Sequence, residues 1–159
     1  MALFMKYGSI DGNVETTGYV KWIMINSFQW GVGRGISSPV GTSADREASH
    51  PSVSEITVSK EMDVATNKLL EDALGGAMNT KVEIAYCTTG KDEVKEFLRY
   101  ILTNTALSGY SVSSGGDRPS ESLSLNFTEV EIKYTSLAVD ESGNPASTTY
   151  NLAAQKLNG

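Results

Sequence analysis

A glycine-rich run, GVGRG from Gly31 to Gly35, is the first pattern with the residue types of a binding site. Loops that cradle phosphate carry a lysine after the last glycine, or they lead from a strand into a helix whose N-terminal N–H groups bind the anion. Here a long polar segment follows the last glycine. We therefore interpret these glycines as turn residues rather than as a nucleotide site.

His50 is the only histidine and Cys87 the only cysteine. A Ser/His/Asp mechanism would have to use His50, but His50 precedes Pro51 in a polar segment and no serine has the G-x-S-x-G surroundings of a nucleophile. Cys87 ends an alternating run, where a small half-buried thiol is common. One cysteine and one histidine cannot supply four zinc ligands, and one cysteine excludes an intramolecular disulfide.

Two groups of oxygen-bearing side chains complete the chemical candidates. Glu129 and Glu131 would lie about 7 Å apart on one strand face, a spacing that overlaps that of a glycosidase pair. Their alternation with Lys133 is more typical of a solvated face, and Lys133 would keep both carboxylates ionised. The run from Asp140 to Asn144 lacks the later glutamate of a calcium loop. We predict no enzymatic activity, no cofactor and no metal.

Composition narrows the class of partner. A length of 159 residues fits one domain, which we place at 1–159, and 13 basic against 19 acidic residues give a net charge of −6. This charge opposes binding to nucleic acid. The start, MALFMKYGSI, lacks the cationic lead and long apolar run of a secretory signal, and no window approaches a membrane span. We expect synthesis in the cytoplasm and no membrane insertion.

The elements that must position these residues are mainly strands. From 115 to 134 two alternating runs, SLSLNF and VEIKY, stand back to back with a phase slip near Thr128, which predicts a hairpin with a tight turn or bulge. Leu123 and Leu125 would face the core, opposite Ser122 and Ser124. This polar face holds small hydroxyls and then charges, so it predicts a surface for assembly.

Further alternating runs predict a first strand near 3–7, a long second strand from 18 to 30, and others near 54–58, 82–86, 94–104, 107–113 and 149–152. A helix is predicted at 63–75, capped by Asp63 or Thr66, with an apolar stripe of Leu70, Ala73 and Leu74 and a left-handed end at Gly75-Gly76. The tail, 140–159, is expected to be partly irregular. About eight strands and one helix predict a β-barrel or sandwich with the helix packed on it.

The segment from 31 to 51 is the longest connection, and its Gly, Ser, Pro and charged residues leave little to bury. Connections beyond about 12–15 residues are uncommon in compact domains and are usually functional or disordered. We therefore expect this polar loop to have a function. The aromatic residues Trp22, Phe28, Trp30 and Tyr110 suit either the core or a protein interface, and for each of them we favour the core. Together with the loop, they make oligomerisation the leading hypothesis.

Several blocks, in order, resemble the haemolysin-coregulated proteins that form the inner tube of the bacterial type VI secretion system. These are an opening strand with a DG turn, then KWIMINSFQWGVGR, SEITVSKEMDVATNKLLEDAL, TNTALSGYSVSSGG and ESLSLNFTEVEIKY. The resemblance implies a mainly β fold: a β-barrel built from two packed antiparallel sheets with one flanking short α-helix. It also implies homohexameric rings that stack into a hollow tube inside a contractile sheath, under a VgrG-type spike. The tube would carry small effector proteins in its lumen and be secreted without a signal peptide, into the medium or a target cell.

Two sets of residues follow from this resemblance. The loop from Gly31 to Pro51 would reach a neighbouring ring through the mixed charges of Arg34, Asp45, Arg46 and Glu47. The lumen, where cargo rests, would be lined by small hydroxyls: Ser111, Ser113, Ser122 and Ser124. Two other hypotheses remain open, a tube subunit of a phage tail or another contractile injection machine, and a monomeric sugar-binding sandwich.

Overall fold

The computed structural model describes residues 1–37, 47–48, 51–89, 94–135 and 146–158. Within these ranges the chain forms one helix, α1 (Thr66–Gly75), and fourteen strands. The strands are β1 (Ala2–Tyr7), β2 (Ile23–Met24), β3 (Ser27–Gln29), β4 (Val32–Gly33), β5 (Ile36–Ser37), β6 (Glu47–Ala48), β7 (Ser52–Val53), β8 (Ile56–Glu61), β9 (Thr80–Thr89), β10 (Val94–Ser113), β11 (Ser120–Asn126), β12 (Glu129–Tyr134), β13 (Ala146–Asn151) and β14 (Lys156–Leu157).

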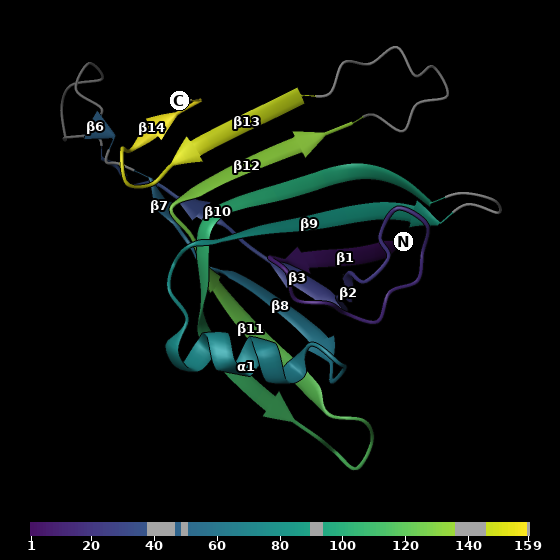
Figure 1. Ribbon diagram of the computed structural model, residues 1–159. Coiled ribbons are helices and arrows are strands. Elements are labelled where there is room, and N and C mark those ends of the chain that lie inside the picture. Colours follow the sequence, from purple (N-terminus) through teal and green to yellow (C-terminus); the bar gives the residue numbers. More distant parts are fainter. Residues whose placement is uncertain (38–46, 49–50, 90–93, 136–145, 159) are drawn as a thin grey trace.

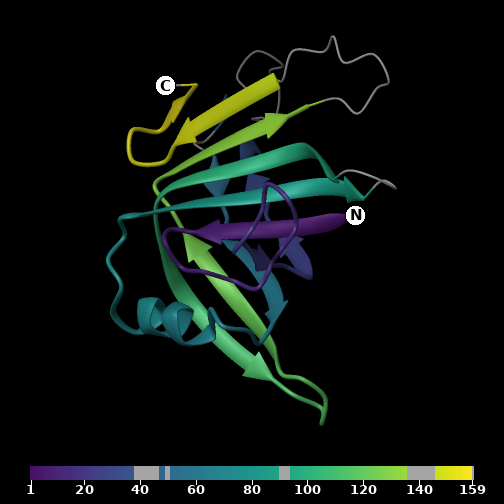
Figure 2. The ribbon, with the colours of Figure 1, turned by 45° about the vertical axis from the view of Figure 1, so that its right-hand side comes forward.

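Two antiparallel sheets share one strand, the 20-residue β10. The large sheet has the order β14-β13-β12-β10-β9-β1-β2, and the small sheet has the order β10-β11-β8-β3. Figures 1 and 2 show β10 bending from the large sheet above into the small sheet below, with α1 beside the small sheet. The mainly β fold with two packed sheets and one short helix is confirmed. Barrel closure is not seen in the strand pairings of the described residues.

The predicted hairpin at 115–134 is wrong, because its two strands do not pair with each other. β11 pairs with the second half of β10, β12 pairs with the first half, and the reversing turn lies at 114–119. The phase slip falls where the chain crosses from the small sheet to the large one. There the N–H of Thr128 donates to the carbonyl of Thr103. Opposite this corner, β10 shifts register and Asn104 adopts a φ of 50°.

The predicted long strand at 18–30 is also wrong. Only Ile23–Met24 and Ser27–Gln29 are extended, and they belong to different sheets, β2 beside β1 and β3 beside β8. Before them the chain turns at Gly18 and Lys21, both of which have positive φ, so Val20 is exposed and Trp22 only half-buried. The alternation in the sequence reflects two short strands and a covering loop.

Helix α1 begins later than the predicted 63–75. The side that faces the core is Ala65, Leu69 and Ala73, at spacings of four residues, whereas Leu74 is 80% exposed. The predicted stripe was therefore one residue out of phase. Asp63 does not cap the helix itself; its carboxylate accepts the N–H of Ala65 just before it. The left-handed end is wrong too, because Gly76 has a φ of −71°.

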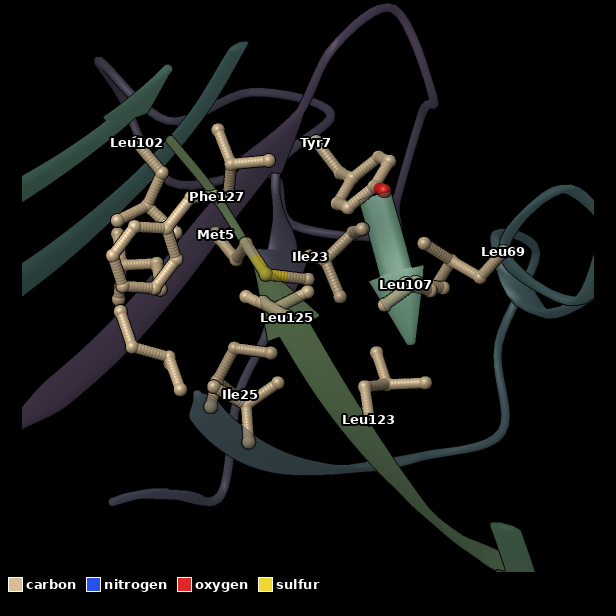
Figure 3. Packing of buried hydrophobic residues seen from close by; sticks show 14 of the residues in the cluster. Met5, Tyr7, Ile23, Ile25, Leu69, Leu102, Leu107, Leu123, Leu125 and Phe127 are labelled. Carbon is tan, nitrogen blue, oxygen red and sulfur yellow. The ribbon is translucent and has the colours of Figure 1, made fainter. Parts of the chain in front are cut away.

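The core fills the space between the sheets and under α1. Figure 3 shows Met5, Ile23, Leu102, Leu107, Leu123 and Leu125 converging from β1, β2, β10 and β11, with Leu69 from α1 at one side and Phe127 at the other. Successive side chains of a strand point to opposite sides of the sheet. Because these apolar residues alternate with polar ones, the polar residues line the outer faces. Phe28, Trp30 and Tyr110 are half-buried against this core, in agreement with the favoured interpretation, and Trp22 packs on a second cluster.

Candidate assembly and cargo surfaces

The outward side of the small sheet carries rows of small polar side chains that cross all four of its strands. In one row Ser111 pairs with Ser122, Ser122 with Ser59, and Ser59 with Ser27. Directly paired residues point to the same side of a sheet, so these serines form a continuous strip. The hydroxyls of Ser27 and Ser59 are hydrogen-bonded to each other at 2.5 Å.

A parallel row contains Gly109, Ser124, Thr57 and Gln29, and Ser113 and Ser120 follow on the other side of the serine strip. Carboxylates stand only at the two ends of the sheet, where Asn126 donates to Glu55 and Arg118 lies near Glu61. We call the surface between them the hydroxyl face; its members are Ser27, Gln29, Thr57, Ser59, Gly109, Ser111, Ser113, Ser120, Ser122 and Ser124.

This face is half-buried or exposed at every position and holds no large apolar side chain, and the charge nearest to its members is Glu61, which pairs with Ser120 at the end of the sheet. The polar character of this face follows from the two-residue period of the strands. The alternate positions point into the core and are occupied by apolar residues, namely Ile56, Val58, Leu123 and Leu125. Surfaces of short hydroxyls offer hydrogen bonds that water also makes, so a passing protein gains little net energy by staying. The face is suited to weak, sequence-tolerant contact.

The outward side of the large sheet is different, because it is charged. The Arg99 guanidinium contacts Glu96, with 2.6 Å between Nη2 and Oε1, and lies 3.6 Å from Glu83. Further along, Lys133 Nζ lies 3.7 Å from Glu131 Oε1. Glu131, one of the two carboxylates considered from the sequence, thus has a lysine partner on a solvated face, and its side chain also accepts a hydrogen bond from Ser147.

The loop from 11 to 22 covers part of this charged side and buries Cys87. Tyr19 stacks on Phe4 with 4.9 Å between ring centroids, and its hydroxyl donates to Glu96. Trp22 meets Tyr19 edge to face and lies under the Arg99 guanidinium. Burial beneath this cover raises the pKa of the Cys87 thiol. A neutral, enclosed thiol is a poor nucleophile.

A buried ion network, which the sequence did not reveal, ties the start of the helix to the small sheet. Lys60 is fully buried and lies 2.5 Å from Glu121 and 2.9 Å from Asp63. Glu121 also accepts hydrogen bonds from the hydroxyls of Thr66 and Tyr110. Burial alone would raise the pKa of Glu121, but the hydrogen bonds from Lys60, Tyr110 and Thr66 outweigh it and hold that pKa below its ordinary value.

The start of the segment 31–51 is a two-stranded ribbon rather than an irregular loop. β4 pairs with β7 and β5 pairs with β6, through Val32↔Val53 and Ser37↔Glu47. We call this ribbon the arm. Gly33 lies in a paired strand, which is not the strand-to-helix setting of a phosphate loop.

A cleft of about 420 Å³ lies where the arm meets the C-terminal strands. Its lining is mainly apolar, and Arg34 is the one charged residue among the described lining residues. The apolar lining includes Trp30 and Val32 from the arm side and Ile132 and Leu157 from the opposite side.

The predicted site residues are placed as follows. Arg34 is exposed on the arm, Glu47 contributes its backbone to β6, and Asp45 and Arg46 lie outside the described residues, as do His50 and Asp140 to Asn144. The four predicted serines all lie on the hydroxyl face, where Ser111 stands directly opposite Ser122. The roles assigned to all eight residues stay predictions.

Six of the ten members of the hydroxyl face were not predicted from the sequence. Thr57 and Ser59 alternate with buried Ile56 and Val58 just as Ser122 and Ser124 alternate with leucines, so the signal was present in SEITVSK. Ser27 could not be assigned, because the predicted long strand hid the change of sheet. Within the described ranges, no three His, Cys, Asp or Glu side chains come together as metal ligands. The helix α1 is the one helix of the described residues, and its 10 residues are far too few to cross a bilayer.

The comparisons with known proteins agree with this architecture. A family profile described as "Type VI secretion system effector, Hcp" matches residues 4–134. The chain belongs to this family. It is therefore an Hcp protein of the type VI secretion system, a secreted protein of a structural rather than a known enzymatic family.

Solved structures show the same fold. One, described as a type six secretion system protein, is 28% identical with a TM-score of 0.88 over 99% of both chains. Hcp1 from Salmonella typhimurium is 21% identical with a TM-score of 0.76, over 98% of this chain and 97% of that one. A type VI secretion system effector from Yersinia pestis is 20% identical with a TM-score of 0.74, over 94% of this chain and 98% of that one. No curated protein sequence matches the chain.

Proposed function

We propose that this Hcp protein is the building block of an expelled tube: six copies close into a ring, rings stack, and small effector proteins travel in the lumen. The tube lies inside a contractile sheath under a VgrG-type spike. The protein is assembled in the bacterial cytoplasm and leaves with the machine, into the medium or a target cell, without a signal peptide. Family membership and the two contrasting sheet faces support this proposal.

The hydroxyl face is the observation that carries the assignment of the lumen. Cargo inside a tube must be held during assembly and released afterwards, so the wall must not bind strongly. The serine strip from Ser27 to Ser111 crosses the whole small sheet without a charge or an apolar side chain. The charged side of the large sheet, with Arg99 and Lys133, then faces outward, where ion pairs keep a surface hydrated.

The arm supports the stacking of rings. It precedes β8 in the chain, lies across a cleft from the C-terminal strands, and carries the exposed Arg34. In our proposal Arg34, Asp45, Arg46 and Glu47 contact the next ring. Side-by-side closure of the ring uses the remaining sides of each subunit, including the edge strand β3 of the small sheet.

Electron microscopy of the purified protein combined with light scattering tests the proposal. A ring gives a mass about six times the 17.1 kDa of the chain and round particles with a central hole. A monomer at high concentration would overturn the tube function and favour a binding domain. Co-purification of small proteins with the rings, lost when the hydroxyl face is blocked, tests the lumen assignment separately.

A further inference from the structure

We infer that the cleft between the arm and the C-terminal strands is a binding site for a small carboxylate with an unbranched hydrocarbon tail, which is the chemistry of a medium-chain fatty acid. Both walls of the cleft belong to a single chain, so the site does not depend on the proposed assembly.

One wall of the cleft is the inner side of the large sheet at its C-terminal edge. On β12, Val130 and Ile132 lie directly opposite Tyr150 and Thr148 of β13. Tyr150 in turn pairs with Leu157 of β14. Directly paired residues point to the same side of a sheet, so these side chains form one surface. The charged residues of β12 alternate with the apolar ones and therefore lie on the opposite side.

The other wall belongs to the arm and is fixed by backbone pairing. Val32 and Val53 pair across β4 and β7, so both side chains point to the same side of the ribbon. The Trp30 indole N–H donates to the carbonyl of Ser54 at 3.1 Å, and its ring meets Tyr100 edge to face with 5.8 Å between centroids. A wall that is already ordered reduces the entropy lost when a ligand binds.

The size and polarity of the cleft suit a small molecule. Its volume is about 420 Å³, and ligand sites typically measure roughly 300–1,000 Å³, with a mainly apolar lining and a few polar groups. Val32 and Leu157, on opposite sides of the cleft, are 54% and 62% exposed. A hydrocarbon tail between the walls would cover this apolar surface and release the water in contact with it.

The charge of the cleft favours an anion. Arg34 is the one charged side chain among the described lining residues, and it makes no ion pair with any described residue. A guanidinium can bind a carboxylate through two parallel hydrogen bonds. The other polar side chains of the described lining are uncharged, namely Thr148, Tyr150 and Gln155, so they do not oppose this preference.

Arg34 is also one of the residues assigned above to the contact with the next ring. A carboxylate in the cleft would compete with that contact for the same guanidinium and would oppose stacking. This consequence rests on the proposed function, whereas binding to the cleft does not.

Calorimetric titration of the parent chain with hexanoate, octanoate and decanoate tests the site. We expect the affinity to rise about threefold to fourfold with each added methylene until the cleft is full. Octanol and octylammonium have the same tail with a neutral or a positive head group. Both should bind several-fold more weakly than octanoate.

Two pairs of variants separate the contributions of charge and apolar contact. Arg34→Gln should weaken octanoate binding about fivefold and leave octanol binding unchanged; its control is Arg118→Gln, an arginine that is 59% exposed outside the cleft lining. Leu157→Gln should weaken binding of every tail several-fold. Its control is Leu74→Gln, at a leucine that is 80% exposed on α1.

Tryptophan fluorescence locates the bound tail. The chain has two tryptophans, and Trp22 lies under Arg99, outside the cleft lining. In Trp22→Phe the remaining indole is Trp30, and octanoate that carries bromine on its tail should quench its fluorescence. In Trp30→Phe the remaining Trp22 should be quenched several-fold less at the same concentration.

Any one of three results would overturn the site: no binding at any tail length, equal affinity for octanoate and octylammonium, or full affinity in both Arg34→Gln and Leu157→Gln. In the first case a neighbouring copy of the chain is the better occupant of the cleft. None of these results changes the mass of the ring, which tests the proposed function separately.

Discussion

Lys60 Nζ lies 2.5 Å from Glu121 Oε1, and neither side chain is accessible to solvent. The two residues pair directly across β8 and β11, the strands that carry the hydroxyl face. The same carboxylate accepts a hydrogen bond from the hydroxyl of Thr66 at the start of α1. The pair therefore fixes the helix against the sheet whose other side we assign to the lumen.

Replacing Glu121 by Ala should lower the free energy of unfolding by about 3–5 kcal/mol, because it leaves the buried Lys60 ammonium without its main partner. Urea unfolding at one fixed protein concentration measures this loss. Glu131→Ala is the control, since Glu131 pairs with a half-exposed lysine and should cost less than about 1 kcal/mol. Equal effects of the two substitutions would show that the buried network is not stabilising.

Acid should weaken the fold through Glu121. Its pKa in the folded protein is lowered from an ordinary 4.5, so the unfolded chain takes up the proton first as the pH falls. The stability from this carboxylate is complete above pH 4.5 and disappears as the pH drops through the lower folded pKa. Unfolding curves between pH 7 and pH 3 should show this decline, and Glu121→Gln should flatten that part of it. An identical pH profile for both proteins would contradict the assignment.

Blocking the hydroxyl face should reduce cargo without breaking rings. Ser113 is exposed on this face, so Ser113→Arg adds bulk and charge at no cost in core packing. We expect rings of unchanged mass but several-fold less effector protein co-purifying with them. Ser147→Arg places the same side chain on the charged side of the large sheet and should leave cargo unchanged. Normal effector retention by Ser113→Arg would remove the hydroxyl face from the lumen.

Deleting residues 38–48 should leave rings but abolish tubes, because the arm is expected to make contacts between rings and not within them. Negative-stain microscopy of the shortened chain measures both properties at once. The ribbon is held by the pairings of β4 with β7 and of β5 with β6, so the deletion keeps the first of these. Tubes of normal length would show that stacking does not use the arm.

Cys87 should report the opening of the loop from 11 to 22. Tyr19 packs on Phe4 over the cluster that contains Cys87, so Tyr19→Ala should cost about 3 kcal/mol locally and speed thiol modification by about 100-fold. Tyr134→Ala, at a residue that is 52% exposed, should not change the rate. A slow, unchanged reaction in Tyr19→Ala would mean that the loop does not guard the thiol.

Burial was predicted correctly from the sequence where a strand stays in one sheet, with one side against the core, along its whole length. Leu123, Leu125 and Phe127 are buried as expected, and Ser122 and Ser124, which alternate with the leucines, face outward, because the two-residue period depends only on local geometry. The same rule failed at 18–30 and at 115–134, since there the chain changes sheets. Pairing of strands distant in sequence is a tertiary property that the local pattern does not contain.

The buried network was missed for a related reason. Lys60 and Glu121 stand at alternating positions that continue the apolar faces of β8 and β11, yet each looks like a solvated charge when read alone. Only their opposition across the strand pair reveals an ion pair. The buried side of α1 was assigned to the wrong leucine because Leu69 and Leu70 are adjacent. Which of the two is buried depends on what the helix packs against.

The mass of the purified protein in solution tests the central claim most directly. Light scattering coupled to size-exclusion chromatography should give about six times the 17.1 kDa of one chain, with larger, stacked species at high concentration. A single species of 17.1 kDa at every concentration would contradict the account of this chain as a tube subunit.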